Sequence, residues 1–165
     1  MKIKRIVKHL LVTDGKLRSA FPPSALQQIE RAIKASEALH AGEIRFVVEA
    51  ALDGSPLFRG QTARQRAVDL FAQLRVWDTQ DNTGVLIYLL LADRAVEIVA
   101  DRGIHAKVDA LAWGAVCRQM EAAFKQSNFE AGVLAGVQAV TQHLAQHFPA
   151  GSHNRNELPD KPVVL

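Results

Sequence analysis

Acidic and amide side chains stand at both ends of one unit in the sequence. The stretch NTGVLIYLLLADRAVEIVAD follows Asp81 directly, starts with Asn82 and ends with Asp101. It contains two apolar runs, 85–91 and 95–100, separated by a short polar break. Such runs predict two strands that pair as an antiparallel hairpin, which places the two ends of the unit side by side. We therefore expect the site chemistry at this edge of the sheet.

Two further carboxylates are predicted to reach the same edge. Glu43 begins a predicted strand over 43–51, which should run parallel to the strand of the hairpin that starts near residue 84. Glu37 continues the apolar stripe of the preceding helix, one turn after Ile33. A carboxylate on a buried stripe must be hydrogen-bonded, paired or bound to a metal, because an isolated buried charge is very costly. The alternative is that the helix end is already exposed at Glu37.

The residues expected at this edge carry oxygen ligands: Glu37, Glu43, Asp81, Asn82 and Asp101. Carboxylate and amide oxygens suit Ca²⁺ or Mg²⁺ rather than zinc. Ligands of open α/β sheets usually bind outside the carboxyl ends of the parallel strands, whereas this set lies at the opposite edge. A second interpretation stays open, because Asp and Asn are favoured in turns and these acids could simply solvate the surface.

Capping signals predict where the helices begin. Ser24 with Gln27, and Thr62 with Gln65, have the spacing of capping boxes. Asn128 is expected to cap the last long helix, whose apolar seam runs to residue 148.

The order of the predicted elements indicates the fold class. Strand 43–51, helix 62–75 and strand 84–91 form a βαβ unit, which has a right-handed crossover in nearly all cases. Adding the hairpin gives an α/β fold, a three-layer sandwich in which a small mixed β-sheet is flanked by helices. We divide the chain into a basic arm or helix over 1–20, the α/β domain over 21–150, and a tail over 151–165 that is either loose or an extended surface strap.

Other residue types with chemical potential are expected to be structural. Trp113 heads the apolar stripe of a helix over 108–125 and is predicted to anchor the core. Cys117 lies on the same stripe, which predicts a buried, inert thiol. His143 and His147 have the spacing of a zinc-binding pair, but an isolated pair of this kind is more typical of exposed histidines.

Composition narrows the functional classes. The chain has 165 residues, 48% of them apolar and 22% charged, which fits one domain with a real core. A net charge of +3 is too weak to argue for nucleic acid, and we expect no nucleic-acid partner. The longest apolar run, 85–92, is far shorter than the ~20 residues of a membrane-spanning helix. A single cysteine fits a reducing compartment, so we expect a cytoplasmic location. The nucleophile-elbow, P-loop, dinucleotide and Cys-x-x-Cys motifs are all missing from the sequence.

The first nine residues are basic without the long apolar run of a secretory signal peptide. We therefore expect this arm not to be cleaved. Apolar residues recur on one side of it at helical spacing: Ile3, Ile6, Val7 and Leu10. The arm is best interpreted as a solvated first helix, although a basic arm can also contact acidic lipid or nucleic acid.

The sequence between about residues 24 and 148 resembles the TPM domain, known from thylakoid-lumen proteins of photosystem II repair and from many bacterial proteins. The resemblance is carried by a Trp-headed helix and by four segments: Gly42-Glu43-Ile44-Arg45, Gly84-Val85-Leu86-Ile87-Tyr88, Asp101-Arg102-Gly103-Ile104 and Asn156-Glu157-Leu158-Pro159-Asp160. These segments look like the short bacterial branch that lacks a membrane anchor. Members often have Asn-Gly directly before the buried strand, whereas here Thr83 separates Asn82 from Gly84.

The resemblance implies a three-layer α/β fold and, in some members, a divalent-metal site that is often a calcium site. It also implies a partner, because bacterial genes of this family tend to neighbour a LemA-type membrane protein. We therefore expect a metal-binding interaction or scaffold module that acts with a membrane-associated partner. The alternative is a metal-dependent phosphatase acting on phosphate monoesters, with Arg102, His105 and Lys107 near the acidic residues.

Overall fold

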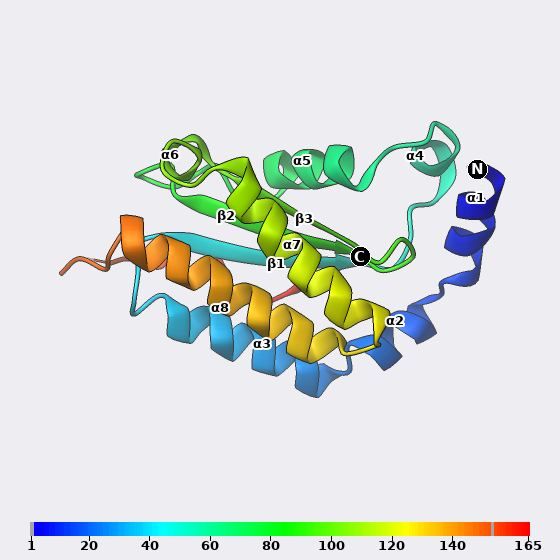
Figure 1. Cartoon of the computed structure of the whole chain (residues 1–165), viewed down its shortest axis with the longest axis horizontal. Helices are drawn as coiled ribbons and strands as arrows, with labels where there is room; N and C mark the ends of the chain where they lie inside the picture. The colour runs from blue at the N-terminus through cyan, green and yellow to red at the C-terminus, as the bar shows by residue number, and fades with distance from the viewer. Residues whose placement is uncertain (1, 153) are drawn as a thin grey trace.

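The computed structural model describes residues 2–152 and 154–165, so Met1 of the predicted arm and His153 lie outside the described residues (Figure 1). The helices are α1 Lys2–Leu11, α2 Asp14–Ala20, α3 Pro23–Ser36, α4 Gly54–Phe58, α5 Ala63–Gln73, α6 Arg102–His105, α7 Ala110–Lys125 and α8 Phe129–His147. The strands are β1 Glu43–Glu49, β2 Gly84–Leu90, β3 Ala95–Ala100 and β4 Val163–Val164.

One mixed sheet has the strand order β3-β2-β1-β4. β1 runs parallel to β2 from the pair Glu43 and Gly84 to the pair Glu49 and Leu90. β2 and β3 form the antiparallel hairpin, and β4 lies parallel to β1 at the other edge. The predicted βαβ unit and hairpin are therefore confirmed, and β4 adds a strand that the sequence interpretation did not include.

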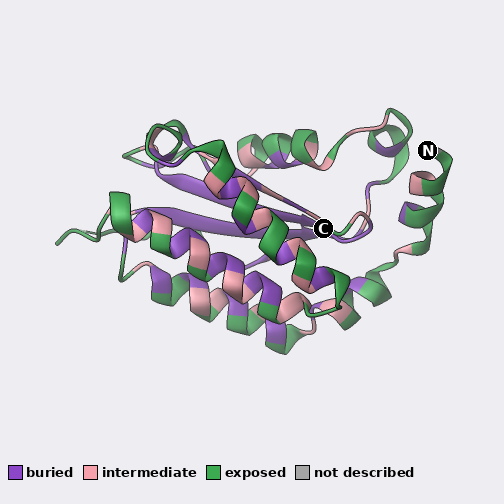
Figure 2. Cartoon of the chain, in the orientation of Figure 1, coloured by how far each residue is buried: buried purple, intermediate pink, exposed green. Residues whose placement is uncertain are grey.

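Helices cover both faces of this sheet, as the three-layer prediction required. α3, α7 and α8 lie on one face and α5 lies on the other (Figure 1). Every residue of β1 and β2 is buried, and the strands are drawn almost entirely in the buried colour (Figure 2). A continuous apolar run is typical of a strand covered on both faces, which is why β2 was recognisable in the sequence, whereas β1 was predicted from the alternation of its apolar residues.

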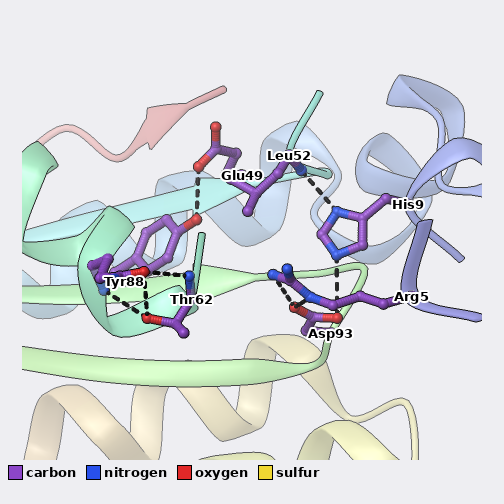
Figure 3. Close-up of polar contacts among 8 residues, drawn as sticks. Arg5, His9, Glu49, Leu52, Thr62, Tyr88 and Asp93 are labelled. Carbon is purple, nitrogen blue, oxygen red and sulfur yellow. Dashed lines mark hydrogen bonds and ion pairs between the residues drawn. The ribbon is translucent and has the colours of Figure 1, made fainter. Parts of the chain in front are cut away.

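The two faces of the sheet differ in what they bury. The face toward α3, α7 and α8 holds the larger cluster, and Trp113 is 6% exposed there, which confirms it as a core residue. The face toward α5 contains a polar group inside the smaller cluster. The hydroxyl of Tyr88 donates a 2.6 Å hydrogen bond to Glu49 (Figure 3). Arg66 of α5 pairs with the same carboxylate at 2.8 and 2.9 Å, so the buried charge is compensated.

Helix starts agree with the capping signals only in part. The box of Thr62 and Gln65 is confirmed, with both reciprocal hydrogen bonds present. The box predicted at Ser24 is wrong, because α3 starts two residues earlier, with Pro22 as N-cap and Pro23 in its first turn. Proline suits the first helical position since its missing N–H needs no partner there. Asn128 is the N-cap residue of α8, but its side chain makes no capping hydrogen bond.

Candidate functional site

The edge of the sheet at the start of β1 and β2 collects most of the predicted site residues. Glu43 opens β1 opposite Gly84, and the end of β3 lies beside β2 at the same edge. The tail from residue 154 onward also passes here before it pairs with β1 as β4. Chain segments far apart in sequence therefore supply the polar groups of this edge (Figure 1).

Glu43 is buried and held by the tail. Glu43 is only 3% exposed. Each of its two carboxylate oxygens accepts a 3.2 Å hydrogen bond from a backbone N–H, one from Glu157 and one from Leu158. Burial raises the pKa of this carboxyl, and the two backbone N–H groups partly oppose that rise. Both of these hydrogen bonds to the Glu43 carboxylate therefore come from backbone N–H groups and neither comes from a basic side chain.

Glu37 lies at the C-cap of α3 and faces the tail acid Asp160. Burial, followed by the proximity of Asp160 and of Glu43, raises the pKa of Glu37 to about 8. Its Oε1 atom is buried and has no hydrogen-bond partner among the described residues. The side chain of Glu37 is therefore half-buried beside other acidic groups, which argues against the interpretation that the helix end is already exposed there.

The tail is fixed to this edge as an extended strap. The side-chain amide of Asn154 donates to the backbone oxygens of Glu37 and His40, at 2.6 and 2.9 Å. Arg45 donates to the backbone oxygens of Pro159 and Lys161. The amide of Asn156 lies 3.1 and 3.2 Å from the two oxygens of Asp160, which it orients.

The hairpin supplies the remaining predicted residues. Asp101 is the N-cap of α6, and its Oδ1 accepts a 2.7 Å hydrogen bond from the N–H of Arg102. Its Oδ2 is buried and, within the described ranges, has no partner. Asn82 adopts a left-handed conformation with φ of 54°, and its backbone oxygen accepts from the N–H of Gly103 at 3.1 Å.

Gly103 explains how closely the two ends of the hairpin approach. A Cβ atom at this position would lie 2.6 Å from the backbone oxygen of Asn82 and 2.8 Å from that of Asp81. Only glycine fits such contact with backbone atoms, since no side chain can move aside. Asp101, Asn82 and Asp81 are therefore held together by backbone packing.

The predicted residues thus fall into two neighbouring groups. Glu37 and Glu43 meet Asp160 of the tail, and line a cavity of about 380 Å³ together with Asn154 and Asn156. Asp81 is exposed and lines a second cavity of about 700 Å³, which shares Asn154 with the first. Among residues 2–152 and 154–165, no three His, Cys, Asp or Glu side chains are arranged as a ready metal-binding group.

Tail residues were missing from the predicted site. Asp160 acts on Glu37, and Glu157 accepts a 2.9 Å hydrogen bond from the N–H of Gln80 while its own N–H binds Glu43. The only sequence signal for them was the segment 156–160, which resembled the family without a role attached. Their position depends on pairing with β1, more than a hundred residues earlier, and no local pattern encodes that.

The side chains that were predicted to be inert or exposed, Cys117, His143 and His147, lie on α7 and α8. Cys117 is partly buried, and burial raises the pKa of its thiol to about 12, which fits the predicted inert role. His143 packs edge-on against Trp113 with ring centroids 5.3 Å apart, so this histidine contributes to packing. Its predicted companion His147 is exposed at the end of α8.

Comparison with known proteins identifies the family. The TPM domain matches residues 16–143 of the chain. The solution structure of the BA42 protein of the psychrophilic bacterium Bizionia argentinensis is 29% identical, with a TM-score of 0.76, and the match covers 86% of this chain and 93% of that one.

The N-terminal domain of a P. gingivalis protein shares the fold at 23% identity, with a TM-score of 0.61 and coverage of 82% and 81%. A search of curated proteins gave no match. In the described part of the chain, no helix has the length and apolar character needed to cross a membrane. With the family match spanning most of its length, this chain belongs to the TPM domain family.

Proposed function

We propose that this chain is a divalent-cation-binding interaction module whose cation, Ca²⁺ or Mg²⁺, ties the C-terminal strap to the edge of the sheet. The single observation that carries this proposal is the Glu37 carboxyl, which is half-buried against Asp160 and Glu43 and has one oxygen without a hydrogen-bond partner among the described residues. Carboxylates placed so repel one another, and a bound cation removes the repulsion.

Two features support a hard cation, although no three His, Cys, Asp or Glu side chains of the described residues form a ready metal-binding group. Two of the predicted ligands, Glu37 and Asp101, have a buried carboxylate oxygen without a hydrogen-bond partner in the part of the chain that the structure describes. Asn154 and Asn156, whose side chains carry amide oxygens that Ca²⁺ also accepts, line the cavity beside Glu37. We assign Glu37, Glu43 and Asp160 as the ligands on the strap side, and Asp81, Asn82 and Asp101 as those on the hairpin side. The cation would supply charge neutralisation.

A cation at this place would control an interaction surface. The strap carries Asn154, Asn156 and Glu157 on its exposed side, next to exposed Asp81. Fixing the strap therefore fixes the polar groups that a partner meets. We propose a membrane-associated partner of the LemA type and a cytoplasmic location, as the resemblance of the sequence to the short bacterial members implies.

A phosphatase is the second candidate, because basic side chains follow Asp101 directly. Arg102, His105 and Lys107 are all exposed on α6 and the turn after it. Transfer of a phosphoryl group needs positive charge around that group, and a cation at Asp101 would add to it. An assay with a generic phosphate monoester, with and without divalent cations, tests this candidate.

The cation proposal is tested by thermal unfolding with Ca²⁺, Mg²⁺, Mn²⁺ or Zn²⁺. A cation that binds only the folded state raises stability by about 2.7 kcal/mol at a hundredfold excess over Kd. We expect Ca²⁺ or Mg²⁺ to raise the melting temperature of the wild type, and expect most of that gain to be lost in Glu37→Gln and in Asp101→Asn.

Glu30→Gln, which removes a carboxylate from the same helix α3 two turns earlier, is the matched control and should keep the full shift. If no divalent cation shifts the wild type, the proposal fails. Equal shifts in the wild type and both site variants would place the cation elsewhere.

A further inference from the structure

The N-terminal helices concentrate the positive charge of the chain. Residues 2–18 contain six Lys or Arg residues and one Asp, a net charge of +5, whereas the whole chain has +3. The rest of the chain is therefore net negative. α1 and α2 lie beyond the carboxyl ends of β1 and β2, at the opposite end of the sheet from the acidic strap (Figure 1).

α1 is held against the domain through one polar side. His9 is buried, and its Nδ1 accepts a 2.9 Å hydrogen bond from the N–H of Leu52 (Figure 3). Its Nε2 lies 3.1 Å from Asp93 in the turn between β2 and β3, and Arg5 pairs with the same carboxylate at 2.8 Å. The orientation of α1 is therefore fixed by contacts on the His9 side, with Ile6 packed beside them.

The apolar side of α1 remains exposed. Ile3, Leu10 and Leu11 are 75%, 69% and 61% exposed. Val7 is 48% exposed on the same side, because positions 3, 7, 10 and 11 lie within one arc of a helix. The exposed lysines Lys4 and Lys8 border this arc. Of the predicted apolar stripe, Ile3, Val7 and Leu10 are therefore exposed, whereas Ile6 packs against the smaller core cluster.

A basic cavity opens beside the exposed face. Its volume is about 610 Å³, and its charged lining consists of Lys8, Lys16 and Arg94. Apolar side chains, among them Val12 and Phe129, form part of its wall. The nearby carboxylate of Asp93 is already paired with Arg5. The positive charge of the cavity thus remains available to an anionic ligand.

We propose that α1 and this cavity form a docking surface for an anionic phospholipid membrane. The helix would lie in the interface with Ile3, Val7, Leu10 and Leu11 among the acyl chains, while the cavity receives a phosphate headgroup. The two features complement such a surface in different ways, since it offers apolar chains beneath a layer of negative charge. Nucleic acid fits less well, because residues 2–11 contain no Phe, Tyr or Trp for base stacking and His9 is buried.

Vesicle co-sedimentation tests this inference, with EDTA in every sample so that the result is independent of the proposed cation site. We expect the wild type to bind vesicles that contain phosphatidylglycerol and to bind vesicles of phosphatidylcholine alone much more weakly. Removing charge in Lys4→Gln/Lys8→Gln should weaken binding by roughly fivefold per lysine. Removing apolar contact in Leu10→Ser/Leu11→Ser should weaken it by about tenfold or more. Lys16→Gln/Arg94→Gln should show a loss similar to that of the first lysine pair.

Matched controls separate the surface from general effects of charge and hydrophobicity. Leu111→Ser removes a leucine that is 78% exposed on α7, and Arg31→Gln/Arg118→Gln removes two exposed charges elsewhere. Both should bind vesicles as the wild type does, and all variants should keep its melting temperature. The inference is overturned if the wild type binds neither kind of vesicle, binds both equally, or is unaffected by the α1 substitutions. A dimer in sedimentation that Leu10→Ser/Leu11→Ser abolishes, without vesicle binding, would assign the surface to a second copy of the chain.

Discussion

The two ends of the sheet shift the pKa of a nearby carboxyl group in opposite directions. At the end where β1 and β2 begin, Glu37 meets Asp160 and Glu43, and its pKa is raised to about 8. At the end where they finish, burial would also raise the pKa of Asp93, but a hydrogen bond from Arg5 and the close approach of His9 outweigh burial and lower it. Both carboxyls are partly buried, so the difference comes from the charge of their neighbours.

This contrast indicates that Asp93 has a structural role, whereas Glu37 belongs to the candidate functional site. Asp93 is a satisfied ion pair that fixes a helix, and its environment is complete within the chain. Glu37 lies among other acids, its Oε1 has no hydrogen-bond partner among the described residues, and a proton or a cation would make its environment more favourable. Unfavourable arrangements of this kind persist where they serve binding, which is why the acidic end carries the proposed function.

The largest loss of stability is expected for a substitution in the core between the two ends. Trp113→Ala should destabilise the protein by about 3–5 kcal/mol, because a large buried aromatic side chain leaves a cavity. Urea unfolding measures the loss. A loss below about 1 kcal/mol would contradict the packing described for α7, since only an exposed residue is so easily removed.

The ion pair at the basic end should give the next largest effect. Asp93→Asn removes the charge that Arg5 and His9 share, and should cost about 1.5–3 kcal/mol, the range for hydrogen bonds to charged groups. The same contribution should disappear in the wild type at acid pH. Asp93 has a folded pKa below its ordinary value, so its stabilisation is present above the unfolded pKa near 4 and is lost as the pH falls through the folded one.

Urea unfolding at pH 7 and at about pH 3 checks both statements, with Asp14→Asn at the start of α2 as a control for a neighbouring exposed acid. The difference between wild type and Asp93→Asn should shrink at the lower pH. A constant difference would show that the carboxylate charge is not what stabilises this end.

Much of the fold was predictable because its signals are local. The run 84–90 is apolar enough to indicate a strand covered on both faces, and the alternation of apolar residues over 43–49 indicates a second strand. The capping box at Thr62 places the helix between them. The hairpin follows from the short polar break before Ala95. These features need only the chemistry of neighbouring residues, so one sequence is sufficient to read them.

The remaining features depend on contacts that span the chain. Strand β4 is two residues long and exists through pairing with β1, so its own residues give no strand signal. The apolar periodicity of α1 predicted a helix, yet periodicity does not say what covers the apolar side. At the acidic end the sequence pattern predicted that Glu37 and Glu43 lie at one edge, but it did not predict that the strap places Asp160 beside them. Whether this edge holds a cation stays a prediction.

The strap should contribute a smaller and more local effect than the ion pair. Asn154→Ala removes two hydrogen bonds to backbone oxygens near the end of α3, at an exposed position, and should cost about 1 kcal/mol. Hydrogen exchange should then quicken at the N–H of Leu165, which bonds to Val48 in the paired strand. Arg155→Ala, at the next exposed position, is the control. Unchanged exchange in Asn154→Ala would show that β4 alone fixes the strap.

The pH dependence at the acidic end should be the smallest effect and the sharpest test of the contrast. A carboxyl whose folded pKa is about 8 binds a proton more tightly in the folded state, so its contribution to stability declines as the pH rises from about 4.5 to 8. This direction is opposite to that of Asp93. Solvent screens the half-exposed side chain, so the change should be modest. Glu37→Gln should flatten the decline and make the variant more stable than the wild type at pH 8 to 9, with near equality at about pH 4.5.

Thermal unfolding between pH 4.5 and 9, in EDTA and then in excess Ca²⁺, measures this dependence. Because a cation competes with the proton for Glu37, Ca²⁺ should restore the stability of the wild type most strongly at the alkaline end, where the carboxyl is ionised. Glu37→Gln should respond little. If the stability of the wild type does not decline between these pH values, ionisation of Glu37 does not destabilise the folded state. The acidic end would then resemble the basic end, where the carboxylate is stabilised without a ligand.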